Sequence, residues 1–138
     1  MTDSASTNLA VVHAFNAAMA QFDYDAALAL IADDCQYQNM PDPGKVMVGP
    51  TGVRAALQPF FGLTIANELV TLRAAESGHL VFLERLDRHQ LPDGRWVELP
   101  VTGVYEVVNG KIKLYRDYFN AQTLYAQWPE LLGGRQAG

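Results

Sequence analysis

The sequence predicts an α+β fold in which helices come first and a run of strands follows. Up to about residue 63 apolar residues recur at helical spacing, whereas from Thr64 onward long stretches are typical of strands. Pro92-Asp93-Gly94 and Asn109-Gly110 separate these stretches with turns that form antiparallel hairpins rather than crossovers. Helices followed by a meander of strands indicate an α+β domain whose strongly curved sheet wraps around the early helices.

The first half of the chain is expected to be mostly helical. Its first apolar residues recur at three- and four-residue spacing, which gives a helix one apolar stripe. Two prolines and a glycine at 41–44 forbid a regular element there. The expected elements are a helix over Thr7–Gln21, a short helix from Asp25 to about Asp34, an extended segment over Gln36–Met40, and a helix that starts at Gly49 and buries Val53, Leu57, Phe60 and Phe61.

The second half is expected to hold four long strands and a closing helix. Gly78 and the two turn sequences separate the strands, and Pro129 follows the helix. The expected strands are Thr64–Ala74, Leu80–Leu91, Trp96–Val108 and Lys111–Phe119, and the helix covers Gln122–Gln127.

Length and composition favour one globular domain and restrict what it binds. The 138 residues are predicted to form a single domain over 1–138, with residues 1–6 frayed. A charged fraction of 18% and a net charge of -5 argue against nucleic acid or an anionic membrane as a partner. No apolar run approaches the roughly 18 residues that span a bilayer, and no signal-peptide pattern is seen, so the chain is expected to be cytoplasmic.

Several kinds of site are excluded by the sequence. The single cysteine, Cys35, excludes an internal disulfide and a cysteine-rich zinc site, and it is expected to be a buried thiol. His13, His79 and His89 do not have the spacing of metal ligands. There is also no Gly-x-Ser-x-Gly nucleophile elbow and no glycine-rich phosphate loop.

The turn sequences predict which residues lie opposite one another in the sheet. Both turns suit a three-residue hairpin loop, with a type I turn followed by a glycine in the left-handed region. Counting outward, Arg85 then lies opposite Val101, and Val101 lies opposite Asp117. If both loops are two-residue turns, Thr102 takes the place of Val101. Either count places Arg85 and Asp117 in one row across three strands.

An Asp–Arg–Asp cluster is therefore expected on an otherwise apolar sheet face. Asp87 lies two residues from Arg85 and shares its face. One guanidinium can hold two carboxylates, and in an apolar cavity the pair separates into a neutral acid and an ionised base. A purely structural ion-pair network is the alternative. The other residues expected on this face are Val81, Leu83, Leu99, Val101, Tyr115 and Phe119.

At these residues the chain resembles the limonene epoxide hydrolase family. Three segments carry the resemblance: Tyr37-Gln38-Asn39-Met40-Pro41, Glu84-Arg85-Leu86-Asp87 and Arg116-Asp117-Tyr118-Phe119. The order of the elements from about Leu9 to Leu132 also fits. The resemblance implies a cone-shaped α+β domain with a mixed or antiparallel sheet. This fold is that of the nuclear transport factor 2-like group, which also includes the SnoaL-like polyketide cyclases.

The resemblance also implies a role for each polar residue. Asp87 would be the general acid that protonates the epoxide oxygen, and Asp117 the general base that takes a proton from water. Tyr37 and Asn39 would hold this water together with Asp117. Arg85 would bridge and orient the two aspartates. Water would open the epoxide in one step, without a covalent enzyme ester, to give a vicinal diol.

Partners and alternatives follow from the same resemblance. A small apolar epoxide and water would be the substrates, no metal or organic cofactor would be needed, and the chain would form a homodimer. An isomerase or cyclase on the same fold, or a small-ligand-binding module without activity, stays open as an alternative. His89 lies two residues after Asp87 and places a polar group on or near the expected pocket face, which leaves the pocket shape open.

Overall fold

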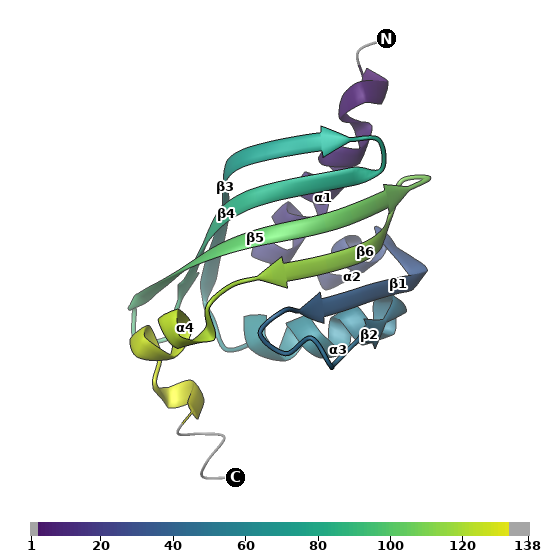
Figure 1. The fold of residues 1–138 in the computed structure, drawn as a ribbon. Helices are drawn as coiled ribbons and strands as arrows, with labels where there is room; N and C mark the ends of the chain where they lie inside the picture. Colours follow the sequence, from purple (N-terminus) through teal and green to yellow (C-terminus); the bar gives the residue numbers. More distant parts are fainter. Residues whose placement is uncertain (1–2, 133–138) are drawn as a thin grey trace.

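The computed structural model describes residues 3–132 and has the predicted α+β architecture. Its six strands form one strongly curved, unclosed sheet in the order β2-β1-β6-β5-β4-β3 (Figure 1). The helices are α1 (Asp3–Ala20), α2 (Tyr24–Leu28), α3 (Gly49–Phe61) and α4 (Ala121–Gln127), and the strands are β1 (Ile31–Asn39), β2 (Met47–Val48), β3 (Ala66–Ser77), β4 (Leu80–Gln90), β5 (Trp96–Val108) and β6 (Lys111–Tyr118).

The sheet is mixed because β1 runs parallel to β6, whereas every other neighbouring pair is antiparallel. Helix α1 crosses the face of β3 to β6, α3 lies against β1, and α4 packs on β5 (Figure 1). In the described part of the chain, no helix is long and apolar enough to cross a membrane.

The boundaries differ most from the prediction in the first third of the chain. Helix α1 begins at Asp3 rather than Thr7, and residues 1 and 2 of the segment predicted to be frayed lie outside the described residues. The segment predicted to end a helix near Asp34 is instead the first half of β1, which starts at Ile31. Parallel pairing with β6, including a hydrogen bond of 2.7 Å from the Ile112 amide to the Leu30 carbonyl, overrides the local helical pattern.

The β4–β5 hairpin has the predicted three-residue loop. The Leu91 amide donates to the Arg95 carbonyl at 2.8 Å, and Gly94 is in the left-handed region with φ 94°. Arg85 consequently lies opposite Val101, as the count from this loop predicted.

The β5–β6 hairpin corrects the prediction that Arg85 and Asp117 share a row. Val108 pairs directly with Lys111 across a two-residue turn, and a bulge in the next residues shifts the register by one. As a result Asp117 lies opposite Gly103, two residues from the row of Arg85. An offset of two residues keeps both side chains on the same face of the sheet.

The concave face of the sheet and the early helices enclose the core. Alternate residues of β4 and β5 are buried, which matches strands with one covered face. Cys35 on β1 is fully buried, as predicted, and burial raises the pKa of its thiol to about 12. The main cluster includes Val12, Phe15, Met19, Ile31, Val53, Val81, Leu83, Tyr105, Val107 and Ile112, and a second one includes Leu91, Val97, Leu99, Val101, Leu124 and Trp128.

Candidate active site

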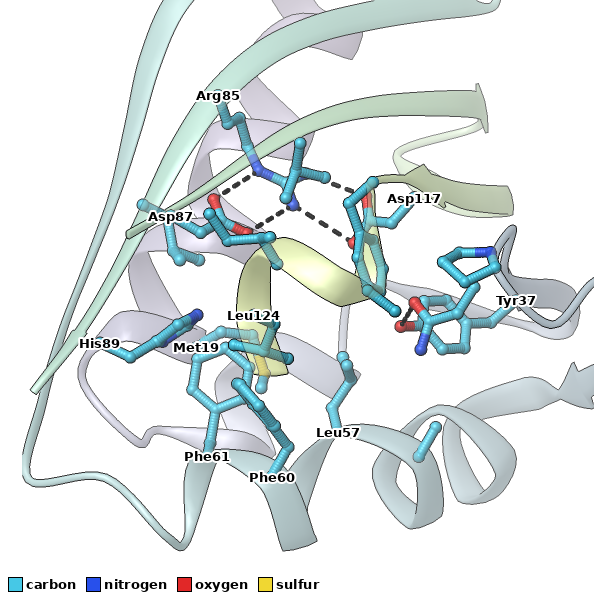
Figure 2. A pocket seen from close by; sticks show the side chains of 18 of the residues that line it. Met19, Tyr37, Leu57, Phe60, Phe61, Arg85, Asp87, His89, Asp117 and Leu124 are labelled. Carbon is cyan, nitrogen blue, oxygen red and sulfur yellow. Dashed lines mark hydrogen bonds and ion pairs between the residues drawn. The ribbon is translucent and has the colours of Figure 1, made fainter. Parts of the chain in front are cut away.

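A cavity of about 360 Å³ lies between α1, α3, α4 and the concave face of the sheet. A volume of this size is enough for a small organic ligand. Most of its wall is apolar, and the polar groups gather on β1, β4 and β6 (Figure 2). Its apolar wall includes Met19, Leu57, Phe60, Phe61, Leu99, Phe119 and Leu124.

Arg85 lies between the two aspartates and holds both of them (Figure 2). Its Nε and Nη2 donate to the two carboxylate oxygens of Asp87, each at 2.9 Å. Its Nη1 and Nη2 donate to the two oxygens of Asp117, each at 3.2 Å. Arg85 is 2% exposed and each aspartate is 7% exposed. The predicted Asp–Arg–Asp cluster therefore exists, and it is buried at the wall of the cavity.

Gly103 is the reason that Arg85 can reach across β5 to Asp117. A Cβ atom at Gly103 would lie 2.7 Å from Nη1 of Arg85 and 2.7 Å from the hydroxyl of Tyr105. These distances are shorter than any normal carbon contact, so only glycine leaves room for the guanidinium here. Gly103 was not among the predicted site residues, although a glycine inside a strand is a known sign of a close approach.

Two tyrosines complete the hydrogen bonding around the cluster. The Tyr105 hydroxyl accepts from Nη1 of Arg85 at 2.5 Å, and the Tyr115 hydroxyl donates to Oδ2 of Asp117 at 3.0 Å. Their rings are stacked with centroids 4.7 Å apart. Tyr105 was also missed by sequence reasoning, although it shares the face of Val101 by simple alternation along β5.

The charges of the cluster favour one neutral and one ionised carboxyl. A single guanidinium balances only one of two buried carboxylates. Burial raises the pKa of the Asp117 carboxyl above its usual range, against the opposing effect of the Arg85 guanidinium. The Asp87 charge raises it further. A proton held within the cluster is therefore easier to keep than in water.

Tyr37 and Asn39 extend the polar wall from β6 to β1. Asn39 is paired with Asp117 in the parallel register of these strands, and the Tyr37 hydroxyl donates to Oδ1 of Asn39 at 2.7 Å. The Tyr37 ring packs on Tyr115 with centroids 4.8 Å apart. Both residues line the cavity, so the structure brings all the predicted site residues to one wall.

Two further polar residues that the prediction did not assign a role also line the cavity. Asn16 on α1 is 5% exposed, and neither atom of its side-chain amide has a hydrogen-bond partner among the described residues. His89 on β4 is 3% exposed and packs against Phe60 and Phe61. Within residues 3–132, no group of three or more His, Cys, Asp or Glu side chains is placed to hold a metal ion.

Solved structures show that the chain has the fold shared by nuclear transport factor 2-like and SnoaL-like proteins. A SnoaL-like polyketide cyclase from Shewanella putrefaciens matches 89% of this chain and 96% of its own with a TM-score of 0.77 and 13% identity. A protein with a ketosteroid isomerase-like fold from Catenulispora acidiphila matches 85% of this chain and 90% of its own with a TM-score of 0.75 and 18% identity. Likeness at this level of identity shows the fold alone.

Sequence comparison narrows the class to a family. The model of the limonene-1,2-epoxide hydrolase catalytic domain matches residues 6–130. The epoxide hydrolase EphG of Mycobacterium tuberculosis is 31% identical over 119 residues, which are 83% of this chain and 74% of that protein. The structure of an LEH-like epoxide hydrolase from M. tuberculosis covers 95% of this chain and 98% of its own with a TM-score of 0.76 and 27% identity. The chain belongs to the limonene-1,2-epoxide hydrolase family.

Proposed function

We propose that the chain adds water to a small, mostly apolar epoxide in one step to give a vicinal diol. Membership of the epoxide hydrolase family supports the reaction class. The observation that carries the mechanism is that Arg85 holds Asp87 and Asp117 together at the wall of a largely apolar cavity. Such a pair can give one proton and take another in the same step.

In this mechanism Asp87 is the acid. Its proton goes to the epoxide oxygen as the C–O bond breaks, so that the oxygen leaves as a hydroxyl rather than as an alkoxide. Asp117 is the carboxyl paired with Asn39 in the parallel register, which leaves Asp87, across the guanidinium of Arg85, for the acid.

Asp117 is the base. It takes a proton from the water whose oxygen forms the new C–O bond, and Tyr37 and Asn39 orient that water beside it. The raised pKa of Asp117 makes its carboxylate a stronger base in the molecules in which the shared proton lies on Asp87. After the reaction Asp117 carries a proton and Asp87 is ionised, and one proton transfer between them through the cluster or solvent restores the starting state.

The test replaces each aspartate by its neutral isostere. Asp87→Asn and Asp117→Asn are each expected to lower kcat/KM for diol formation by at least about 10³-fold while the melting temperature stays close to that of the wild type. Asp33→Asn, at an exposed position on β1, is the control. Diol formed in ¹⁸O-labelled water by the wild type is expected to contain one labelled oxygen. Turnover retained in Asp117→Asn would exclude this residue as the base.

An isomerase or cyclase is the second candidate, because SnoaL-like cyclases share the fold at a similar TM-score. Such an enzyme would use one aspartate base and would convert its substrate without adding water. Labelled water separates the two functions, because only the hydrolase places ¹⁸O in a product carbon–oxygen bond. A mechanism with a single aspartate base does not explain why Asp87 and Asp117 are both bound by the guanidinium of Arg85.

We further propose that the chain forms a homodimer through the outer face of the sheet. No helix within residues 3–132 covers this face, which carries exposed Leu72, Phe82, Trp96 and Tyr118 on four neighbouring strands. Sedimentation velocity at micromolar concentration is expected to give twice the mass of one chain. Phe82→Glu is expected to give monomers, and a wild type that sediments as a monomer would contradict the proposal. A cytoplasmic location stays a prediction.

A further inference from the structure

A chain of buried polar groups lies under the apolar end of the cavity and ends at His89. Nδ1 of His89 lies 2.6 Å from Oδ1 of Asn67, its direct neighbour across β3 and β4. Nδ2 of Asn67 donates to the Thr64 hydroxyl at 2.9 Å, and this hydroxyl donates to the Phe61 carbonyl at 2.7 Å. His89, Asn67 and Thr64 are all at most 7% exposed.

The direction of these hydrogen bonds fixes the tautomer of His89. The Phe61 carbonyl can only accept, so the single hydroxyl hydrogen of Thr64 is used there. Thr64 must then accept from the amide nitrogen of Asn67, which turns Oδ1 of Asn67 toward the imidazole. Since Oδ1 can only accept, Nδ1 of His89 carries the hydrogen. The other ring nitrogen, Nε2, is therefore an acceptor.

Nε2 of His89 is the last atom in this series of hydrogen-bonded groups, and His89 lines the cavity. Within the described residues Nε2 has no hydrogen-bond partner, whereas the edges of the ring pack on Phe60 and Phe61. Figure 2 shows the ring on the same side of the cavity as Asp87, above the two phenylalanines. Among the described residues only the amide atoms of Asn16 are fully buried without a partner, so Nε2 keeps accessible surface in the cavity and can accept a hydrogen bond from a ligand that brings a donor.

The ring is neutral at physiological pH, as an acceptor must be. Burial, and to a smaller extent the Arg85 guanidinium, lower the pKa of His89 to about 4. The groups in contact with the ring, the Asn67 amide and two phenylalanine rings, bring no charge, and the charged groups on the same face of β4 are Asp87 and Arg85. His89 therefore presents one lone pair to the cavity over the range in which the cluster of Arg85 and the aspartates would work.

We propose that Nε2 of His89 binds a hydroxyl group of the substrate, so that the chain acts on epoxides that also carry an alcohol. This inference rests on the proposed epoxide hydrolysis and adds the substrate class. His89 and Asp87 lie two residues apart on one strand, which places their backbones about 7 Å from each other. The alcohol oxygen and the epoxide oxygen that Asp87 protonates should be separated by a similar length, or about three to five carbon atoms.

The first test compares 1,2-epoxycyclohexane with its 4-hydroxymethyl derivative. The wild type is expected to prefer the hydroxylated epoxide by about tenfold or more in kcat/KM, which corresponds to one hydrogen bond. His89→Phe keeps the aromatic packing and removes the acceptor. It is expected to lose this preference: the ratio of kcat/KM for the hydroxylated epoxide over the plain epoxide, in which any general effect of the substitution on activity cancels, should fall to about one through KM of the hydroxylated epoxide. His13→Phe, at an exposed position on α1, is the control. An unchanged preference in His89→Phe would overturn the inference.

The second test needs no turnover. Cyclohexanemethanol is expected to bind the wild type at least about tenfold more tightly than it binds His89→Phe, and methylcyclohexane is expected to bind both equally, as measured by ligand-observed NMR. If no epoxide is hydrolysed, the proposed function fails, and this binding difference still decides the role of His89. Equal binding of the alcohol to both proteins would show that Nε2 does not recognise hydroxyl groups.

The third test is independent of any variant. In protein with ¹⁵N-labelled histidine, the long-range ¹⁵N–¹H spectrum at pH 7 is expected to show His89 as the neutral tautomer with hydrogen on Nδ1. Addition of cyclohexanemethanol is expected to shift the Nε2 resonance. A hydrogen on Nε2, or a charged ring, would contradict the inference.

Discussion

At the scale of single residues, Arg85 and Gly103 depend on each other. The guanidinium lies over the position where a side chain of residue 103 would be, and in this place it reaches Asp117 on the far side of β5. Tyr105 accepts a hydrogen bond from the same nitrogen and limits its movement. The two carboxyls are thus held by the planar guanidinium of Arg85, which fits in this place because Gly103 has no side chain.

Gly103→Ala is expected to disturb this arrangement directly. The new Cβ would lie 2.7 Å from both Nη1 of Arg85 and the hydroxyl of Tyr105, so one of them must move. We expect a loss of about 10²-fold in kcat/KM for diol formation and of about 1–3 kcal/mol in the free energy of unfolding. Gly44→Ala is the matched control, because a Cβ there has no atom within 4 Å. Full activity of Gly103→Ala would show that the position of the guanidinium is not critical.

Arg85→Ala is expected to damage both activity and stability. It leaves Asp87 and Asp117 buried without a positive partner, and breaking a buried ion pair in this way costs about 3–5 kcal/mol. Urea denaturation at pH 7 measures this loss. The loss should shrink as the pH falls, because protonation removes the uncompensated negative charge. Arg88→Ala, on the opposite face of β4, is expected to change little, and an Arg85→Ala protein as stable as wild type would refute the argument.

At the scale of elements, β4 carries the polar half of the site. Arg85, Asp87 and His89 occupy alternate positions that face inward, and three buried polar side chains in a row are unusual for a strand. Arg85 and His89 each have a partner from another element, Asp117 from β6 and Asn67 from β3, and Asp87 is bound by Arg85 on the same strand. The strand can bury these groups because its neighbours satisfy them.

Helix α3 lines the cavity, and its first residue, Gly49, lies close to the backbone of β1. Gly49 has φ 71°, and a Cβ there would lie 2.6 Å from the carbonyl oxygen of Asp33. Gly49→Ala is therefore expected to lower stability by about 2–3 kcal/mol, through backbone strain and displacement of β1. Gly78→Ala is the control, since Gly78 has φ 58° but open space around it, and it reports the strain alone. Equal melting temperatures for the two variants would exclude the contact with Asp33 as a cause.

At the scale of the whole molecule, buried His89 couples folding to pH. Its pKa is about 4 in the folded chain and about 6.5 when unfolded, so below pH 6.5 the unfolded state binds the proton first. Stability from this residue is thus present above pH 6.5 and is lost as the pH falls toward 4. The loss amounts to about 3 kcal/mol.

This dependence is checked by measuring the free energy of unfolding between pH 7 and 4. The curve of His89→Phe is expected to fall less steeply than that of the wild type, by about 3 kcal/mol over this range. Replacement of the exposed His13 by glutamine serves as the control. Parallel curves for the wild type and His89→Phe would show that His89 does not change its proton affinity on folding.

The sequence by itself determined the α+β class, the limits of β5, and the shared face of Arg85, Asp87 and Asp117. These features depend on short-range periods and turn residues, which a single chain displays locally. Tyr37 and Asn39 were found through the resemblance of their segment to a family rather than through any local pattern.

Only the tertiary structure decided the parallel pairing of β1 with β6 and the bulge that places Asp117 opposite Gly103. The position of Arg85 over Gly103 and the chain from Phe61 to His89 were decided in the same way. The physical reason is that alternation fixes which face a side chain occupies, whereas its partner along that face depends on register. Register is set by contacts between strands that are distant in sequence, and a shift of two residues leaves the local pattern unchanged.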